Sequence, residues 1–286
     1  MLTYLFPGQG SQFQGMGEDL FIQFPELTQQ ADDYLGYSIA ELCKTDTQQK
    51  LHLTQYTQPA LYTVSALSYL KIEAESTTLP DYVAGHSLGE YNALFAAGVF
   101  DFITGLKLVS KRGELMSQAQ NGGMAAVVGI KRPQLEKILA EYQLTELTIA
   151  NDNAPEQKVL SGLQVDINRA QEIFSRLNIT FIPLKVSGAF HSSFMAPAQQ
   201  EFSQFLDSFS FNKPKIPVLA NVNAKPYNPM AIKNNLVQQI TQTVEWTTTI
   251  EYLLAKPNMA FKEIGPGSVL TGLLKKIQAH AENITA

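Results

Sequence analysis

Runs of apolar residues separated by turn-forming residues divide the first part of the chain into short strands and longer helices. Residues 4–6 are predicted to form a buried strand that ends in a Pro-Gly-Gln-Gly turn at residues 7–10. Residues 82–84 form a second predicted strand, which leads into a glycine-bounded tight turn at residues 85–89. Apolar residues at helical spacing predict helices at residues 59–69, 90–97 and 103–119. This alternation of strands and helices predicts an α/β protein.

The middle of the chain has a different order of predicted elements. Strands are expected at residues 124–130, 147–150, 158–160 and 180–186, and helices at residues 132–142 and 165–177. The resulting order, β-α-β-β-α-β, is typical of a ferredoxin-like unit. We therefore predict a ferredoxin-like subdomain of residues 123–187, inserted into a larger α/β domain of residues 1–122 and 188–286.

The composition is that of an ordinary globular enzyme. The chain has 286 residues, of which 45% are hydrophobic and 16% charged, so it can bury a sizeable core. Its formal net charge of −5, without any Lys/Arg-rich run, argues against a nucleic-acid partner. No apolar run is long enough to span a membrane, and no segment resembles a signal peptide. The start at Met1 and the lack of linkers predict a free-standing protein.

Cysteine usage predicts a reducing compartment and no metal site. The single cysteine, Cys43, excludes an internal disulfide, and its place on the apolar side of a short predicted helix favours a buried thiol. No Cys/His cluster has the spacing of zinc ligands. We therefore expect a cytoplasmic enzyme without a metal ion.

Residues 85–89, Gly-His-Ser-Leu-Gly, match the G-x-S-x-G pattern of a nucleophile elbow. Small residues two positions either side of Ser87 let the chain turn sharply, which pushes the serine hydroxyl out of the backbone. The backbone N–H of Leu88 would then point toward a developing oxyanion, close to the positive N-terminus of the next helix. Because a strand is predicted before the turn and a helix after it, Ser87 is predicted to be a nucleophile rather than part of a chance glycine turn.

A serine nucleophile needs a base within hydrogen-bond reach, and the chain has four histidines. His86 is adjacent to Ser87, so its side chain is expected to diverge and to support the turn. His52 lies in a polar stretch and His280 near the C-terminal end, whereas His191 follows a predicted strand and precedes two serines. His191 is therefore the candidate base by elimination. No Asp or Glu occupies an obvious third position, so backbone carbonyls are expected to orient the base, giving a dyad.

Several segments together resemble the malonyl-CoA:acyl carrier protein transacylase family, which includes acyltransferases of polyketide synthases. They are Pro-Gly-Gln-Gly-Ser-Gln at residues 7–12, Gly-His-Ser-Leu-Gly-Glu-Tyr at 85–91, Lys-Arg-Gly-Glu-Leu-Met at 111–116, Gly-Ala-Phe-His-Ser at 188–192, Thr-Gln-Pro-Ala at 57–60 and Ile-Gly-Pro-Gly-Ser-Val-Leu at 264–270. They follow the family's order from end to end of the chain. The resemblance implies that the larger domain is α/β-hydrolase-like and carries the ferredoxin-like insert.

The resemblance also implies roles for the residues that carry out the chemistry. Ser87 would carry the acyl group as an ester, and His191 would act as the base. The histidine ring would be held by the backbone carbonyl of Gln239. The backbone N–H groups of Gln9 and Leu88 would form the oxyanion hole.

Three further residues are expected to bind the substrate. Arg112 matches the family's carboxylate-binding position, and its planar guanidinium can hold the malonyl carboxylate with two parallel hydrogen bonds, which lysine cannot reproduce. Phe190, directly before the base, would crowd the α-carbon of the acyl group and favour malonyl over methylmalonyl. Gln58, in the Thr-Gln-Pro-Ala segment, is expected to line the same site.

These features predict an enzyme that moves malonyl from malonyl-CoA to the phosphopantetheine thiol of an acyl carrier protein by a ping-pong reaction. The partners would be malonyl-CoA and a carrier protein or a carrier domain of a polyketide synthase. Coenzyme A enters only as the substrate thioester, so no cofactor is expected. Residues 91–102 and 187–192 look more like the trans-acting polyketide branch than the fatty acid branch.

Three alternatives remain open from the sequence. An acyl hydrolase of the same fold would share Ser87 and His191 but would not need Arg112. A lipase or esterase would normally place an acid between the serine and the histidine in chain order, and none is evident. A docking module without activity would not need an intact set of Ser87, His191, Gln9 and Arg112.

Overall fold

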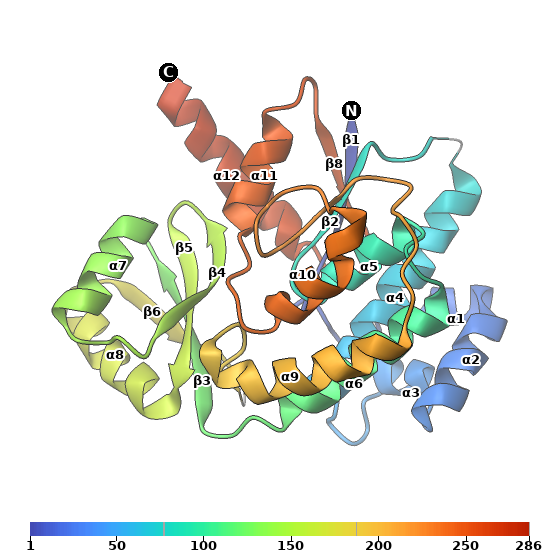
Figure 1. Cartoon of the computed structure of the whole chain (residues 1–286), viewed down its shortest axis with the longest axis horizontal. Coiled ribbons are helices and arrows are strands. Elements are labelled where there is room, and N and C mark those ends of the chain that lie inside the picture. Colours follow the sequence, from blue (N-terminus) through green and yellow to red (C-terminus); the bar gives the residue numbers. More distant parts are fainter. Residues whose placement is uncertain (77, 187, 286) are drawn as a thin grey trace.

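The structure, a computed structural model that describes residues 1–76, 78–186 and 188–285, is an α/β protein with two separate four-stranded sheets (Figure 1). One sheet is parallel and the other antiparallel, and helices flank both. Ser187, which begins one of the polyketide-like segments and ends the predicted subdomain, lies outside the described residues.

The parallel sheet contains the first strand of the chain. Its strands pair in the order β7-β2-β1-β8, and their bounds are β1 (Leu2–Phe6), β2 (Tyr82–Gly85), β7 (Val218–Leu219) and β8 (Ala260–Glu263). Side chains of β1 alternate between the faces, so Tyr4 and Phe6 belong to one buried cluster and Leu5 to another. Both faces of this sheet are therefore buried, as expected of parallel strands.

Helices of the larger part of the molecule cover the two faces of the parallel sheet. Residues of α4, α5 and α6 join the cluster of Tyr4 and Phe6, and residues of α11 and α12 join the cluster of Leu5. The helix bounds are α1 (Glu18–Gln23), α2 (Pro25–Leu35), α3 (Ile39–Lys44), α4 (Thr54–Glu75), α5 (Gly89–Ala96), α6 (Phe102–Ser117), α9 (Ala196–Phe205), α10 (Ile232–Gln239), α11 (Trp246–Leu254) and α12 (Val269–Thr285), with 3-10 turns η1 (Ser193–Met195), η2 (Leu206–Ser208) and η3 (Pro229–Ala231).

The antiparallel sheet follows the element order expected from the sequence, β-α-β-β-α-β. Its elements are β3 (Gly122–Val128), α7 (Arg132–Glu141), β4 (Thr148–Ala154), β5 (Gln157–Leu163), α8 (Gln164–Arg176) and β6 (Thr180–Pro183). The strands pair in the order β4-β5-β3-β6. Leu135 and Leu139 of α7 and Phe174 of α8 pack with strand residues in a third buried cluster, so both helices cover one face.

A short segment before α11 connects the two parts of the molecule. The backbone N–H of Val244 donates to the Ala150 carbonyl at 2.9 Å, and the Val244 carbonyl accepts from the Asp152 N–H at 3.0 Å. Arg132, at the start of α7, forms ion pairs with Glu245 at 3.0 Å and with Asp152 at 3.5 Å. The edge strand β4 is therefore attached to the larger part by backbone pairing as well as by charge.

Most predicted elements lie within a few residues of the observed ones, with two clear differences. The helix predicted from Pro59 begins at Thr54, and Pro59 lies inside it. A proline this close to a helix start removes one backbone hydrogen bond without ending the helix. The strand predicted to reach Val186 ends at Pro183. The Leu184 N–H still donates to the Met124 carbonyl of β3 at 2.8 Å, and the chain then turns, with the Val186 N–H bonded to the Leu184 carbonyl at 3.0 Å.

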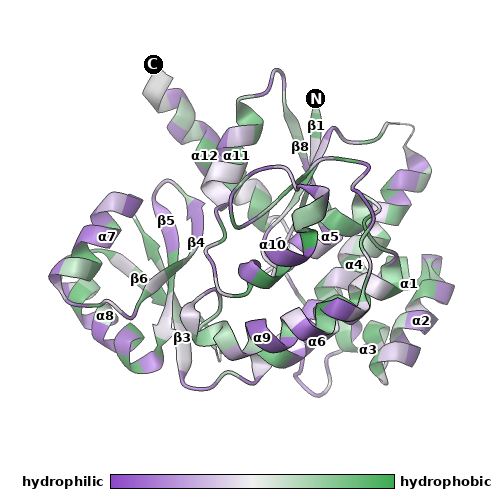
Figure 2. Cartoon of the chain, viewed as in Figure 1, coloured by the Kyte–Doolittle hydropathy of each residue, from purple (hydrophilic) through white to green (hydrophobic). Residues whose placement is uncertain are grey.

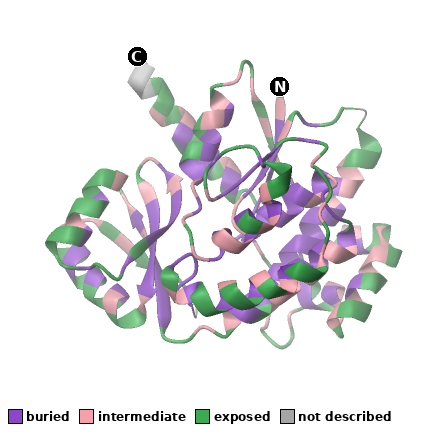
Figure 3. Ribbon diagram, in the orientation of Figure 1, coloured by how far each residue is buried: buried purple, intermediate pink, exposed green. Residues whose placement is uncertain are grey.

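Burial and hydropathy follow this layered arrangement. Apart from the edge strands β6 and β8, most strand residues and much of α4 and α5 are buried, whereas the outer faces of α2, α7 and α8 are exposed (Figure 3). Helices α7, α8 and α9 carry hydrophobic and hydrophilic residues on different sides (Figure 2). Across the described part of the chain, no helix combines the length and the apolar character needed to cross a membrane.

Candidate active site

Ser87 lies at the sharp turn between β2 and α5. Its φ of +50° is in the left-handed region, which is strained for a residue with a side chain and marks a constrained backbone. A Cβ on Gly85 would lie 1.9 Å from the Gly89 carbonyl oxygen, and a Cβ on Gly89 would lie 2.0 Å from the Phe6 carbonyl oxygen. Only glycine at both positions lets the turn pack this closely against itself and against the end of β1.

His191 reaches Ser87 from the loop before η1. Its Nε2 lies 2.8 Å from Ser87 Oγ, and its Nδ1 lies 2.7 Å from the backbone carbonyl oxygen of Gln239. A carbonyl can only accept, so Nδ1 carries the proton and Nε2 is free to accept from the serine hydroxyl. Burial, and secondarily the charge of Arg112, lowers the pKa of His191 to about 3, so the ring is neutral at neutral pH. The pair therefore has the geometry of a nucleophile and its base.

Arg112 brings a buried positive charge to the same serine. It projects from α6 and is only 1% exposed. Its guanidinium donates to Gln58 Oε1 at 2.8 Å, Gln239 Oε1 at 3.0 Å and Ser87 Oγ at 3.2 Å. All three partners are uncharged, and Arg112 forms no ion pair with any Asp or Glu in the described ranges. A buried guanidinium that no acidic side chain neutralises is suited to receive a carboxylate.

A chain of side-chain hydrogen bonds fixes Gln58 beside Arg112. Gln58 Nε2 donates to Thr54 Oγ1 at 3.0 Å, and the Thr54 hydroxyl donates to Gln9 Oε1 at 2.9 Å. The Gln58 amide therefore has its oxygen toward the guanidinium and its nitrogen toward α4's first turn. This series of hydrogen bonds also connects the loop that carries Gln9 to Arg112, the candidate carboxylate-binding residue.

The predicted site residues meet around one small cavity of about 100 Å³. Its lining includes Ser87, His191, Arg112, Gln9, Leu88, Gln58 and Phe190, together with Met116 from α6 and Met124, Asn151, Leu184 and Val186 from the region of the antiparallel sheet. Gln239 lies outside this lining but contacts Ser87, His191 and Arg112. A cavity this small suits a short acyl group, since pockets for drug-sized ligands measure roughly 300–1,000 Å³.

Three buried polar residues behind the elbow were not predicted from the sequence. Asn221 Oδ1 accepts from the Ser87 N–H at 2.7 Å, and Asn221 Nδ2 donates to the Gly85 carbonyl at 2.7 Å. Glu90, in the first turn of α5, accepts from the Asn221 N–H at 3.0 Å and from the Tyr227 hydroxyl at 2.7 Å. The only sequence signal for Glu90 was its place three residues after Ser87, and Asn221 and Tyr227 had none.

Of the other candidate groups, His86 also lines the cavity at Ser87, whereas Cys43, His52 and His280 lie outside its lining. His86 Nε2 lies 2.7 Å from Asn153 Oδ1 of β4, so its ring joins the elbow to the antiparallel sheet. Cys43 is fully buried, as predicted, and burial raises the pKa of its thiol to about 12. His52 is exposed, and His280 lies at a different pocket. Across the described ranges, no three His, Cys, Asp or Glu residues are grouped to hold a metal ion.

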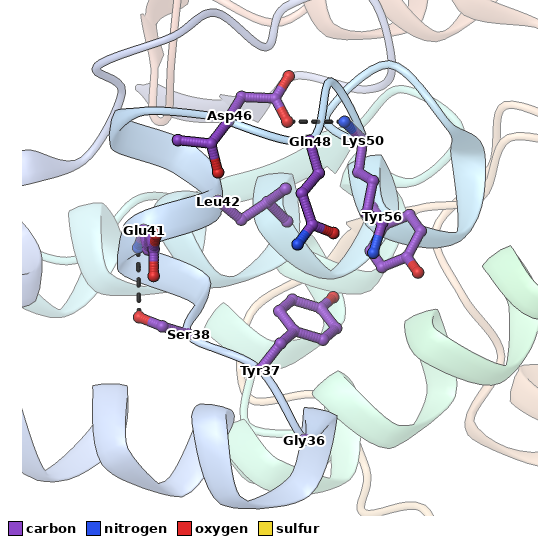
Figure 4. A pocket seen from close by; sticks show the side chains of 10 residues that line it. Gly36, Tyr37, Ser38, Glu41, Leu42, Asp46, Gln48, Lys50 and Tyr56 are labelled. Atoms are coloured by element: carbon purple, nitrogen blue, oxygen red, sulfur yellow. Dashed lines mark hydrogen bonds between the residues drawn. The ribbon is translucent and has the colours of Figure 1, made fainter.

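A roomier pocket of about 340 Å³ lies beside α3 and the residues that follow it (Figure 4). Its lining includes Tyr37, Glu41, Gln48, Lys50 and Tyr56. Most of these side chains are partly or fully exposed, and none is a nucleophile with a base beside it. The smaller cavity at Ser87 is therefore the candidate active site.

The chain is similar over its whole length to known acyltransferases. Residues 3–286 match the acyl transferase domain family. The polyketide biosynthesis malonyl CoA-acyl carrier protein transacylase PksC of Bacillus subtilis is 56% identical over 284 residues, which cover 99% of each chain. A malonyl CoA-acyl carrier protein transacylase from Burkholderia pseudomallei has a TM-score of 0.95 and 50% identity over 98% of each chain. A malonyl-transacylase in complex with its type II polyketide synthase acyl-carrier protein has a TM-score of 0.91 and 35% identity, covering 96% of this chain and 92% of that one.

Proposed function

This chain belongs to the acyl transferase domain family, and we propose that it transfers malonyl from malonyl-CoA to the phosphopantetheine thiol of an acyl carrier protein. The observation that carries the proposal is the buried Arg112 guanidinium, which lies 3.2 Å from Ser87 Oγ and forms no ion pair with any residue that the structure describes. Malonyl is a short acyl group with a free carboxylate. It matches both the small cavity and the unpaired buried charge.

In the first half of the proposed reaction, Ser87 attacks the thioester carbonyl of malonyl-CoA. His191 Nε2 takes the hydroxyl proton, and its Nδ1–H stays bound to the Gln239 carbonyl. The backbone N–H groups of Gln9 and Leu88 stabilise the tetrahedral oxyanion. The carbon–sulfur bond then breaks, and the proton on His191 passes to the departing thiolate of coenzyme A. The product is a malonyl ester on Ser87.

In the second half, the phosphopantetheine thiol of the carrier protein attacks this ester. His191 removes the thiol proton and returns it to Ser87 Oγ as the ester bond breaks. Arg112, held in place by Gln58, binds the malonyl carboxylate throughout, and Phe190 limits substitution at the α-carbon. The proposed chemistry uses no metal or redox cofactor.

We further propose that the enzyme acts in trans in polyketide synthesis. Support comes from its similarity over the whole length to a polyketide biosynthesis transacylase, and from a related transacylase that binds a polyketide synthase carrier protein. A role in fatty acid synthesis is the alternative. A cytoplasmic location remains a prediction from the sequence.

The finer description of the fold is also a proposal. We propose an α/β-hydrolase-like domain of residues 1–122 and 188–286 with a ferredoxin-like subdomain of residues 123–187. The parallel sheet and its elbow before α5 support the first part. The strand order β4-β5-β3-β6, with two helices on one face, supports the second.

The test is to follow the acyl group. The purified protein is mixed separately with malonyl-, methylmalonyl- and acetyl-CoA, and the intact mass is recorded before and after a holo carrier protein is added. We expect a malonyl adduct that is absent in Ser87→Ala and that passes to the carrier faster than to water. Ser208→Ala is the matched control, because Ser208 is exposed and outside the cavity lining.

The main alternative, an acyl hydrolase of the same fold, predicts a different result. Malonyl-CoA would give no adduct, and acyl groups preloaded on the carrier would be released as free acids. That outcome would also remove the role proposed for Arg112.

A further inference from the structure

Glu90 is a buried acid that the proposed reaction does not use. It lies in the first turn of α5 and is 1% exposed. Its Oε1 accepts from the Asn221 N–H and the Tyr227 hydroxyl, and its Oε2 accepts from Gln239 Nε2. All three partners act as donors, so the site is built for a carboxylate rather than for a neutral acid.

Two of these partners connect Glu90 to Ser87. Asn221 accepts from the Ser87 N–H at 2.7 Å, and Gln239 Nε2 donates to the Ser87 carbonyl oxygen at 2.8 Å. The Gln239 backbone carbonyl also receives the His191 Nδ1–H at 2.7 Å. Both sides of the serine backbone and the orientation of the base are therefore held by residues that Glu90 anchors.

Glu90 sets the orientation of the Gln239 side-chain amide. Its nitrogen faces the Glu90 carboxylate, and its oxygen accepts from Arg112 at 3.0 Å. A reversed amide would place its N–H groups against the guanidinium and its oxygen against the carboxylate, which are two repulsive contacts. Gln239 thus links a buried cation to a buried anion without a direct ion pair, which leaves Arg112 free for a substrate carboxylate.

We propose that Glu90, in its ionised form, is a positioning residue that aligns Ser87, His191 and Arg112 through Gln239 and Asn221. This inference rests on the proposed function, because its effect is on the acylation of Ser87. Glu90 does not contact the reacting atoms, and its contribution is the geometry of the groups that do.

Loss of the Glu90 charge at lower pH should therefore slow acylation. The charged and titratable groups that face Glu90 are Arg112, Tyr227 and Tyr91. Burial raises the pKa of Glu90 to about 7, against the lowering effect of its hydrogen bonds and of Arg112. A proton on the carboxyl replaces an acceptor with a donor, and the contact with Gln239 Nε2 is lost or the amide turns. The pKa of His191 is about 3, so the base itself does not titrate in this range.

The experiment measures the rate of Ser87 acylation by malonyl-CoA and by acetyl-CoA between pH 5.5 and 8.5. We expect the wild-type rate to fall with decreasing pH for both substrates, with a midpoint near 7 set by the Glu90 carboxyl. Glu90→Gln should remove this acid limb and lower the rate at pH 8 on the order of 10²-fold, because the reacting groups are no longer held in place. Glu172→Gln, an exposed acid on α8, is the matched control and should keep the wild-type profile.

Tyr227→Phe keeps the test informative if Glu90→Gln does not fold. It removes one hydroxyl donor to the carboxylate without touching Ser87 or His191, so it should move the acid limb to higher pH. An acid limb near pH 7 that persists in Glu90→Gln, or that does not move in Tyr227→Phe, would overturn the inference. If the wild type forms no malonyl adduct at any pH, the proposed function fails instead.

Discussion

Replacing Arg112 by alanine tests how the substrate is recognised. In the wild type, the guanidinium lies at the wall of the cavity, and its hydrogen-bond partners among the described residues are all neutral, so a malonyl carboxylate would supply the anion that pairs with it. Without Arg112, that carboxylate would enter a buried cavity unpaired, at a cost of about 3–5 kcal/mol. We therefore expect kcat/KM for malonyl loading, relative to acetyl loading, to fall by roughly 10²–10⁴-fold.

The ratio of the two substrates is the quantity to measure. Arg112 also donates to Ser87 Oγ and to Gln239, so its removal should slow acetyl loading too, but this common loss cancels in the ratio. Initial rates of Ser87 acylation with each coenzyme A thioester, followed by intact mass, give both values. Arg112→Lys keeps the charge but not the planar fork, and it should give an intermediate ratio.

Arg176→Ala is the matched control for these variants. Arg176 is exposed on α8, where it pairs only with Glu172, so its removal should leave the ratio unchanged. A melting temperature near the wild-type value would show that each variant is folded. Equal losses for malonyl and acetyl in Arg112→Ala would refute the assignment of the carboxylate site.

Three further variants test other parts of the site. Phe190→Leu should enlarge the space at the α-carbon and raise methylmalonyl loading relative to malonyl by about 10-fold or more, as measured by competition between the two thioesters. Gly89→Ala places a Cβ 2.0 Å from the Phe6 carbonyl oxygen. It should lower the free energy of unfolding by about 1–3 kcal/mol or more, lower the melting temperature and abolish the Ser87 adduct. Gly272→Ala, which has open space around it, should change none of these. The pKa of His191 falls from 6.5 to about 3 on folding, so the unfolded chain binds a proton that the folded one does not. The free energy of unfolding should therefore decrease as pH falls below about 6.5. Urea titrations at pH 7 and pH 5 should show a smaller decrease between these two pH values in His191→Asn than in the wild type. An equal decrease in that variant would contradict the burial of a neutral histidine.

Local patterns predicted the sharp turn at Ser87 better than they predicted the residues around it. The glycines at positions 85 and 89 are needed because of contacts within a few residues of Ser87 and with β1, so the five-residue pattern carries most of the information about this turn. His191 was found by elimination, since nothing near it in the chain shows that its ring faces residue 87. That proximity depends on how the loop before η1 packs across the end of the parallel sheet.

The network behind the serine could not be predicted for the same reason. Asn221 and Tyr227 lie in an irregular stretch with no periodic pattern, and they reach the elbow only in the folded chain. Arg112 looks like an ordinary surface arginine on a helix, and its carboxylate-binding role was implied only by the family resemblance. In the structure it is buried because the facing residues Gln58 and Gln239 supply polar partners.

The fold, too, was predictable where local patterns specify it and not where contacts between distant residues do. The order of elements in the antiparallel sheet was readable because each strand and helix there has its own apolar period. The two-residue strand β7 and the pairing of β1 with β8, which are more than 250 residues apart, depend on contacts that no local pattern specifies. The early start of α4 was missed because Pro59 resembles a helix start.

The wall of the acyl cavity comes from two separate parts of the fold, so the two parts can be varied independently. Ser87 and Arg112 come from the turn after β2 and from α6, both in the part of the molecule built on the parallel sheet, whereas Met124, Asn151 and Leu184 come from the antiparallel sheet and the residue after it. Exchanging the antiparallel sheet and its two helices between relatives can thus alter which acyl groups fit without changing the reacting groups. Such a graft must keep the contacts that join the two units. Its Arg132 and its β4 must still match the Val244–Glu245 segment of the recipient, and its Asn153 must still reach His86 of the elbow.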